Sequence, residues 1–289
     1  MSWFQNPTKY GRGRKKDACK PWPQVTGTLQ KSLKRKVKAA SKFLVKRSYF
    51  VPQFKTMDIV ITGASKGIGK AIAMRFAEAG FRIIICSRSK ASLQQAENDI
   101  KKQHISANIL TYEVDMASTS AVKQFARQLI KDGIEPAVLV NNAGQFIPGS
   151  IYNEEEGTLE KMIEVNLYSA YHFTRELLPE MMQRKSGHIF NICSIASLQA
   201  YANGGSYSIS KFALLGFSKN LREEMKPHGI KVTAVCPGAT LTASWEGSDI
   251  DPKRIMEVND VADMVFAASQ LSPMAVVEDI ILRPQLGDL

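Results

Sequence analysis

The stretch that decides the fold is Thr62-Gly63-Ala64-Ser65-Lys66-Gly67-Ile68-Gly69, because it joins an apolar, strand-like run to a helical pattern that begins at Lys70. Glycines at such a junction let the chain turn sharply and let the backbone approach a phosphate closely. The helix start offers that phosphate free N–H groups and the positive end of a dipole. The stretch therefore predicts a phosphate-binding loop made of Gly63, Ser65, Lys66, Gly67, Ile68 and Gly69.

The rest of the chain after Met57 alternates between apolar runs and helical patterns, which is typical of βαβ units and a parallel sheet. The predicted strands are Asp58 to Thr62, Arg82 to Ser87, Asn108 to Val114, Ala137 to Asn141, His188 to Cys193, Lys231 to Cys236 and Asp279 to Arg283. The predicted helices are Gly69 to Ala79, Lys90 to Lys102, Ser118 to Lys131, Leu159 to Asn166, Tyr171 to Gln183, Ser208 to Lys226 and Val261 to Leu271. Residues 57 to 289 are thus expected to form one doubly wound α/β domain with a seven-stranded parallel sheet.

A candidate acid/base pair lies in one of these helical segments. Tyr207 and Lys211 are four residues apart, so both side chains lie on one helix face. A nearby ammonium favours the phenolate and lowers the pKa of a phenol, which lets the pair exchange a proton with an alcohol or a ketone. Ser194 follows the fifth predicted strand, at the carboxyl edge of the sheet, where its hydroxyl can bond a substrate oxygen.

The ordered motifs of residues 57 to 289 resemble those of the short-chain dehydrogenase/reductase family, which has a Rossmann fold. The loop has the family's spacing T-G-x-x-x-G-x-G, and Asn141-Asn142-Ala143-Gly144 matches its N-N-A-G element. The resemblance implies that Asn166, Ser194, Tyr207 and Lys211 form the catalytic tetrad, in which Asn166 helps to hold a water. It also implies cofactor contacts for Asp115, at the adenine ring, and for Asn142, Ala143, Gly144, Tyr207, Lys211, Pro237, Gly238, Thr240 and Thr242. The implied chemistry is hydride transfer between a nicotinamide and a carbonyl or alcohol carbon.

The end of the second predicted strand indicates which nicotinamide cofactor is used. Relatives that prefer NAD carry an acidic residue there, which bonds the ribose and repels a 2′-phosphate. This chain has Ser87 at that position, followed by Arg88, whose guanidinium can hold a phosphate through two hydrogen bonds. Lys66 adds a second cation from the glycine loop. We therefore expect an NADP(H)-dependent oxidoreductase, with Tyr207 as its acid/base.

The positive charge of the chain lies almost entirely in its first 56 residues. The whole chain has a formal net charge of +11, but residues 1 to 56 hold 15 basic side chains and one acid, Asp17. Residues 57 to 289 hold 23 basic and 26 acidic side chains, a net charge of −3. We expect residues 1 to 28 to be disordered and a basic amphipathic helix to start at Leu29 and stop at Pro52. Four interpretations of this extension stay open: a nucleic-acid arm, a membrane-surface helix, a transit-like peptide, or sequence upstream of a true start at Met57.

Two function classes therefore compete. One is the enzyme, and the other is a cofactor-sensing binding or regulatory protein that docks on nucleic acid or a membrane through residues 1 to 56. The scattered cysteines and histidines predict no metal site, and no apolar run reaches the roughly 18 to 20 residues of a membrane span. We expect a cytoplasmic protein and, by family analogy, a homodimer or homotetramer.

The substrate is less well defined by the sequence than the reaction. Phe146, Tyr201 and Trp245 either line an apolar pocket or are ordinary packing. The chain end lacks the G-G of many relatives that reduce oxoacyl carriers, and a small-carbonyl or pterin-type reductase stays open.

Overall fold

The computed structural model describes residues 57–242, 245, 247 and 249–288. Within them, seven parallel strands form one sheet in the order β3-β2-β1-β4-β5-β6-β7. The strands are β1 (Asp58–Thr62), β2 (Arg82–Ser87), β3 (Ile109–Glu113), β4 (Pro136–Asn141), β5 (Gly187–Ile192), β6 (Ile230–Pro237) and β7 (Asp279–Leu282). The order reverses between β1 and β4, and in open α/β sheets ligands bind at such a switch point, outside the carboxyl ends of the strands.

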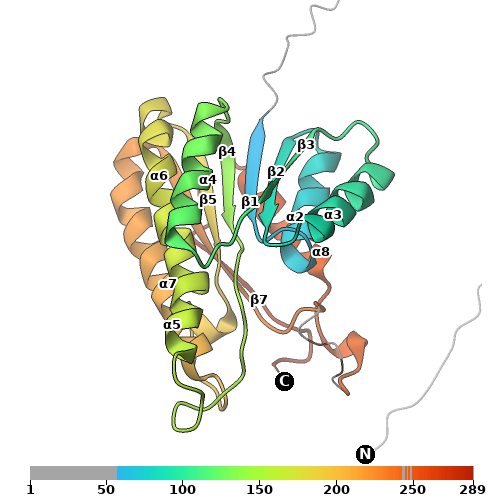
Figure 1. The fold of residues 1–289 in the computed structure, drawn as a ribbon, viewed down its shortest axis with the longest axis vertical. Helices are drawn as coiled ribbons and strands as arrows, with labels where there is room; N and C mark the ends of the chain where they lie inside the picture. Colours follow the sequence, from blue (N-terminus) through green and yellow to red (C-terminus); the bar gives the residue numbers. More distant parts are fainter. Residues whose placement is uncertain (1–56, 243–244, 246, 248, 289) are drawn as a thin grey trace, which may run out of the picture. The chain divides into compact units, whose positions relative to one another are not determined.

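Helices cover both faces of the sheet (Figure 1). One face carries α2 (Gly67–Glu78), α3 (Lys90–Gln103) and α8 (Val258–Ser269), which pack on the buried side chains of β1 and β2. The other face carries α4 (Thr119–Lys131), α6 (Ser169–Arg184) and α7 (Gly205–Met225). A shorter helix, α5 (Thr158–Ile163), precedes α6. Because both faces are covered, the central strands are apolar on both sides, as in Ile59, Val60 and Ile61, which are fully buried.

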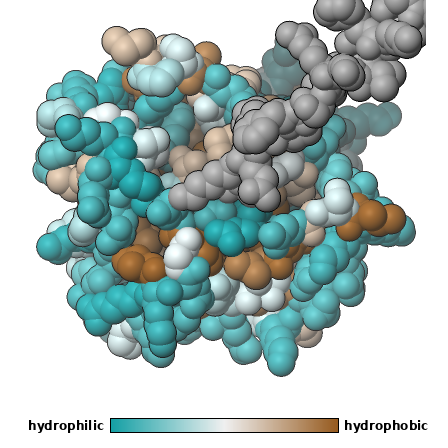
Figure 2. Space-filling view, turned by 90° about the horizontal axis from the view of Figure 1, so that it is seen from above, coloured by the Kyte–Doolittle hydropathy of each residue, from teal (hydrophilic) through white to brown (hydrophobic). Residues whose placement is uncertain are grey.

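The strands run downward in Figure 1, so the site lies at the lower, carboxyl edge of the sheet. Figure 2 shows the molecule from above, at the opposite edge, where hydrophilic residues dominate and hydrophobic ones form small separate patches. Small scattered apolar patches are normal on a protein surface. No helix among the described residues is long and apolar enough to cross a membrane.

The predicted fold class is confirmed, and every predicted strand is present with ends that shift by one residue at most. The prediction of separate helices over Leu159 to Asn166 and Tyr171 to Gln183 is wrong, because α5 continues through a π-helical turn, η1 (Glu164–Tyr168), into α6. The helix predicted from Leu29 to Pro52 lies outside the described residues. Within them, the cysteines Cys86, Cys193 and Cys236 are free and buried.

Candidate functional site

The glycine loop is held in place by hydrogen bonds from the segment that follows β4. The Thr62 hydroxyl accepts the backbone N–H groups of Asn142 and Ala143, both at 3.0 Å. The Asn142 side-chain amide donates to the carbonyls of Thr62 (2.9 Å) and Gly63 (3.0 Å). Thr62 and Asn142 therefore tie the carboxyl ends of the two central strands together, at the switch point of the sheet.

Close packing explains why two of the loop positions are glycine. A Cβ on Gly69 would lie 2.4 Å from the Asn142 side-chain nitrogen, and one on Gly63 would lie 2.8 Å from the Ala143 Cα. Gly63 also has a φ of +64°, in the left-handed region. The loop thus has no room for side chains on its inner side, and its backbone is free to contact a ligand on the other.

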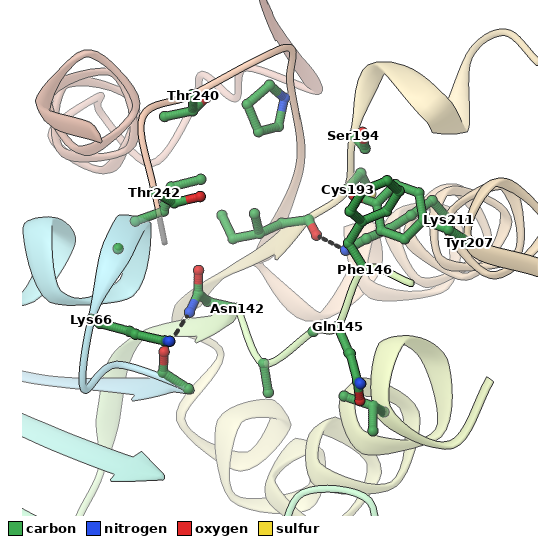
Figure 3. Close-up of a pocket in the computed structure, with 18 of the residues that line it drawn as sticks. Lys66, Asn142, Gln145, Phe146, Cys193, Ser194, Tyr207, Lys211, Thr240 and Thr242 are labelled. Atoms are coloured by element: carbon green, nitrogen blue, oxygen red, sulfur yellow. Dashed lines mark hydrogen bonds between the residues drawn. The ribbon is translucent and has the colours of Figure 1, made fainter. Parts of the chain in front are cut away.

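The start of α2 is suited to bind an anion. Lys66 is its N-cap residue, and the first turn carries no acidic side chain that would neutralise the helix dipole. The Lys66 side chain is exposed and lies on the same side of the pocket as Asn142 (Figure 3). The site residues predicted from the loop therefore surround one helix N-terminus, and this arrangement fits a dinucleotide's pyrophosphate.

The predicted residues for the adenosine end lie in the same cavity, which has a volume of about 910 Å³. Its wall includes Ser87 and Arg88 at the end of β2, and Asp115 after β3. Arg88 is exposed, and the Ser87 hydroxyl donates to the Ser89 carbonyl (3.3 Å). One Asp115 carboxylate oxygen accepts the Ala117 N–H (3.1 Å). The two cations, Lys66 and Arg88, thus line the same cavity. No acidic residue stands at the end of β2.

Asn166 lies in the π-helical turn η1 and is fully buried. Its side-chain oxygen accepts the Gln145 N–H (2.7 Å), and its nitrogen donates to the Gln145 carbonyl (3.0 Å) and the Ser210 hydroxyl (2.8 Å). These bonds join the segment after β4 to α7. π-Helical turns are rare and often occur at functional sites. Asn166 therefore holds two walls of the site in register.

The other three tetrad residues lie at the far end of the cavity from Lys66 (Figure 3). The Lys211 amine is buried and donates to the Ile192 carbonyl (2.8 Å). It lies 5.8 Å from the centre of the Tyr207 ring, one turn earlier in α7. The Ser194 hydroxyl accepts the Ala196 N–H (3.1 Å) as the cap of a short 3₁₀ helix. The structure thus brings the predicted tetrad together beside Gly144, where a Cβ would lie 3.2 Å from the Asn166 oxygen and 3.5 Å from the Lys211 nitrogen.

The protonation of this group differs from the expectation that a nearby ammonium lowers the pKa of Tyr207. Burial raises the pKa of the Tyr207 phenol, and the Ser194 hydroxyl beside it opposes the rise only in part. Burial also lowers the pKa of Lys211. Desolvation is therefore the largest cause of both shifts, and it favours the uncharged form of each group. Tyr207 keeps its proton at neutral pH.

The sequence left open whether three aromatic residues line a pocket or are ordinary packing. All three line the cavity: Phe146, Tyr201 and Trp245. Phe146 packs edge-to-face on Tyr207, with ring centres 4.9 Å apart. Burial raises the pKa of Tyr201 to about 12, so that ring also carries a neutral hydroxyl. The wall is completed by the segment after β6, with Pro237, Gly238, Thr240 and Thr242.

Sequence reasoning missed the residues that hold the start of α7. The Glu154 carboxylate accepts the Ser206 N–H (3.3 Å) and the Ser206 hydroxyl, at the first turn of the helix that carries Tyr207 and Lys211. Glu154 therefore caps α7 from a distant loop. Caps from the residue before a helix can be read from sequence, but this one comes from 52 positions away and leaves no local signal.

The parallel sheet and its glycine loop define a Rossmann-type α/β protein. The model of the short chain dehydrogenase family matches residues 58–252. A sepiapterin reductase of Chlorobaculum tepidum is 30% identical over 239 residues, or 80% of this chain and 97% of the relative. An uncharacterized oxidoreductase of Staphylococcus epidermidis is 29% identical over 227 residues, or 78% and 96%.

Solved structures agree with the sequence relatives. A metagenomic short-chain oxidoreductase in complex with NADP matches with a TM-score of 0.68 and 30% identity, covering 79% of this chain and 97% of that chain. The closed form of a serine dehydrogenase complexed with NADP⁺ matches with a TM-score of 0.73 and 26% identity, covering 81% and 97%. The chain therefore belongs to the short-chain dehydrogenase family and is an oxidoreductase of that family.

Proposed function

We propose that this protein is an NADP(H)-dependent reductase of ketones or aldehydes, with Tyr207 as the proton donor. The observation that carries the proposal is one cavity that has Lys66 and the glycine loop at one end and Tyr207, Ser194 and Lys211 at the other. Arg88 lines the same cavity. The NADP in one of the two similar structures and the NADP⁺ in the other support the choice of cofactor.

The residues present fit such a cofactor. Gly63, Ser65, Gly67, Ile68 and Gly69 would hold its pyrophosphate, and Ser87, Arg88 and Asp115 would hold its adenosine end. Asn142, Ala143, Gly144, Pro237, Gly238, Thr240 and Thr242 would hold the nicotinamide end. When bound, the reduced nicotinamide supplies a hydride to a carbonyl carbon.

The protein's own groups handle the proton. The Ser194 hydroxyl would bond the substrate oxygen, and the Tyr207 phenol would donate its proton to that oxygen. A phenol whose pKa is raised is protonated at neutral pH, which suits reduction better than oxidation. Lys211 would restore the proton through its buried amine, and Asn166 would keep α7 and the segment after β4 aligned.

The direct test is an activity screen of the full chain against ketones and aldehydes, with NADPH and with NADH. The loss of absorbance of the reduced nicotinamide measures the reaction. We expect turnover with NADPH on at least one carbonyl class. If the chain binds NADPH but none of the carbonyl compounds in the panel is reduced, the proposed reaction is contradicted and the family assignment stays intact.

Arg88→Ala is expected to weaken NADPH binding by about ten- to a hundredfold, because a charge-assisted hydrogen bond to the 2′-phosphate is lost. NADH has no such phosphate, so its dissociation constant should change by less than about twofold. Both are measured by titration of protein fluorescence. The matched control is Lys90→Ala, since Lys90 is an exposed cation two residues away that does not line the cavity. Equal losses for both cofactors would overturn the role of Arg88.

Residues 57 to 289 are proposed to form the whole catalytic domain, and residues 1 to 56 a basic extension. Deleting residues 1 to 56 should leave the thermal midpoint within about 2 °C and kcat/KM within about twofold, because the described core and cavity are built from residues after 56. Scanning calorimetry and the carbonyl assay measure the two quantities. Loss of soluble protein would show that the extension supports the fold.

A homo-oligomer is proposed as well. Ile209 and Phe212 on α7 are 42% and 44% exposed, and Tyr168, the last residue of η1, is 45% exposed. Large apolar side chains gathered on neighbouring helices favour association.

A further inference from the structure

Two half-exposed aromatic side chains lie close to Tyr207 in the cavity wall. Phe146 is 43% exposed, although it packs edge-to-face on the Tyr207 ring with ring centres 4.9 Å apart (Figure 3). Tyr201 is 44% exposed, and its ring lies against Gly204, where a Cβ would be 3.2 Å from a ring carbon. Gly204 is the N-cap residue of α7, three residues before Tyr207. Both rings therefore line the cavity close to the proposed proton donor.

The segments that carry the two rings are fixed to each other and to the site. Gln145, which precedes the first ring, bonds through its N–H (2.7 Å) and its carbonyl (3.0 Å) to the Asn166 side chain. The second ring is followed two residues later by Asn203. Its carbonyl accepts the Gly149 N–H (3.2 Å), and its side-chain oxygen accepts the Ser150 hydroxyl (2.7 Å). Because these bonds fix the backbone on both sides, the two rings are positioned before a ligand binds, which lowers the cost of binding.

The charged side chains that line the cavity, among the residues that the structure describes, are not available to a substrate near Tyr207. Three of them belong to the proposed phosphate and adenosine contacts: Lys66, Arg88 and Asp115. The Lys211 amine donates to a backbone carbonyl (2.8 Å), and the Asp288 carboxylate forms an ion pair with Arg283. This end of the cavity therefore offers a substrate aromatic rings and neutral polar groups.

Aromatic rings attract other rings more strongly than their buried area alone explains, in edge-to-face or offset stacked arrangements. We propose that Phe146 and Tyr201 form a binding site for a neutral planar ring attached to the reacting carbonyl, so that the substrates are aryl ketones and aryl aldehydes. This inference rests on the proposed reductase function. A carboxylate on the ring would lose its hydration without gaining a cation, so such substrates should bind more weakly.

The experiment measures kcat/KM of the full chain with NADPH for three ketones. Acetophenone carries the aromatic ring, cyclohexyl methyl ketone has the same carbon skeleton without it, and 4-acetylbenzoate adds a charge to it. The aryl preference is the ratio of kcat/KM for acetophenone to kcat/KM for cyclohexyl methyl ketone. The intrinsic reactivity of each ketone is the same for every variant, so it cancels when this ratio is compared between proteins. Fluorescence titration gives the dissociation constant of NADPH for each protein.

The variants Phe146→Leu and Tyr201→Leu each replace a ring by an apolar side chain that is not aromatic. Each should lower the aryl preference by about three- to tenfold, the range for one aromatic contact, and change NADPH binding by less than about twofold. Tyr201→Phe keeps the ring and should keep the preference. Either leucine variant carries the test if the other does not fold.

The matched control is Tyr152→Leu, which makes the same chemical change outside the cavity. Tyr152 lies in the segment after β4, is 87% exposed and does not line the cavity, so this variant should keep the aryl preference of the unaltered protein. The unaltered protein should also reduce 4-acetylbenzoate at least about tenfold less efficiently than acetophenone.

Four outcomes would overturn the inference. Equal losses of kcat/KM for both uncharged ketones in the leucine variants would show that the rings only position Tyr207. Equal kcat/KM for 4-acetylbenzoate and acetophenone would show that the site does not require a neutral ring. Turnover of other carbonyls but of no aryl ketone would leave the reductase function standing without this substrate class. Failure to reduce any carbonyl would overturn the reductase function, and the inference with it.

Discussion

Tyr207→Phe will lower turnover of carbonyl substrates with NADPH by about a hundred- to ten-thousandfold, the usual range for removing a general acid. The substitution deletes one oxygen and leaves the ring, which keeps its edge-to-face contact with Phe146. The glycine loop with Lys66 lies at the other end of the cavity, so the dissociation constant of NADPH should change by less than about twofold.

The matched control is Tyr201→Phe, because Tyr201 also lines the cavity and has a neutral hydroxyl. Unlike Tyr207, it does not lie on α7 but follows the short helix after Ser194. It should lose far less activity. Single-turnover kinetics with bound NADPH separate the chemical step from product release. Equal losses in the two variants would mean that the cavity needs both hydroxyls for binding and that Tyr207 is not the proton donor.

Acid will destabilise the protein through His188, which is buried near the start of β5 and stacks on Phe190. The Thr233 hydroxyl donates to the Val277 carbonyl, so the His188 Nε2 bonded to that hydroxyl (2.8 Å) carries the ring proton. The other ring nitrogen, Nδ1, is buried without a partner among the described residues. A second proton there would have no acceptor, and burial lowers the pKa of His188 to about 3.

The direction of this effect follows from linkage. The unfolded chain binds a proton at His188 below pH 6.5 and the folded protein does so only near pH 3, so stability is lost as pH falls between these values. The loss approaches 1.4 kcal/mol per pH unit, or about 3 kcal/mol between pH 7 and pH 4.5. Urea unfolding at the two pH values measures it.

His188→Leu should remove most of this pH dependence, because leucine packs on Phe190 and does not titrate. His228→Leu is the control for replacing a histidine by leucine, because His228 is only partly buried, in the turn after α7. If His188→Leu keeps the same difference in unfolding free energy between the two pH values as the unaltered protein, the acid sensitivity comes from the carboxylates.

The sheet was predictable from the sequence because its signals are local. Apolar runs such as Arg82 to Ser87 coincide with β2, and the glycine loop marks the switch from strand to helix. The prediction failed between Asn166 and Tyr171, where the sequence has no residue that breaks a helix and the chain passes through η1 into α6. The π-helical turn η1 places Asn166 where it bonds to Gln145 and Ser210, and both of these partners are distant in the sequence.

The residues that line the site were predictable from the sequence, but the groups that hold them in place were not. Motifs at strand ends gave the residues that face the cavity, because strand ends of a parallel sheet meet at one edge. The groups that hold them, such as the Thr62 hydroxyl and Glu154, bond to partners 80 and 52 positions away. The raised pKa of Tyr207 also depends on how deeply α7 is packed, which residue spacing does not contain.

The π-helical turn at Asn166 makes the site sensitive to insertions and deletions, a kind of change that leaves composition almost untouched. Removing one residue from Glu164–Tyr168 would restore an ordinary α-helix and rotate α5 by about 100° relative to α6. The hydrophobic pattern of either helix would survive, yet Asn166 would no longer reach both Gln145 and Ser210. The number of residues in this helix, and not only their identity, is therefore constrained by the site.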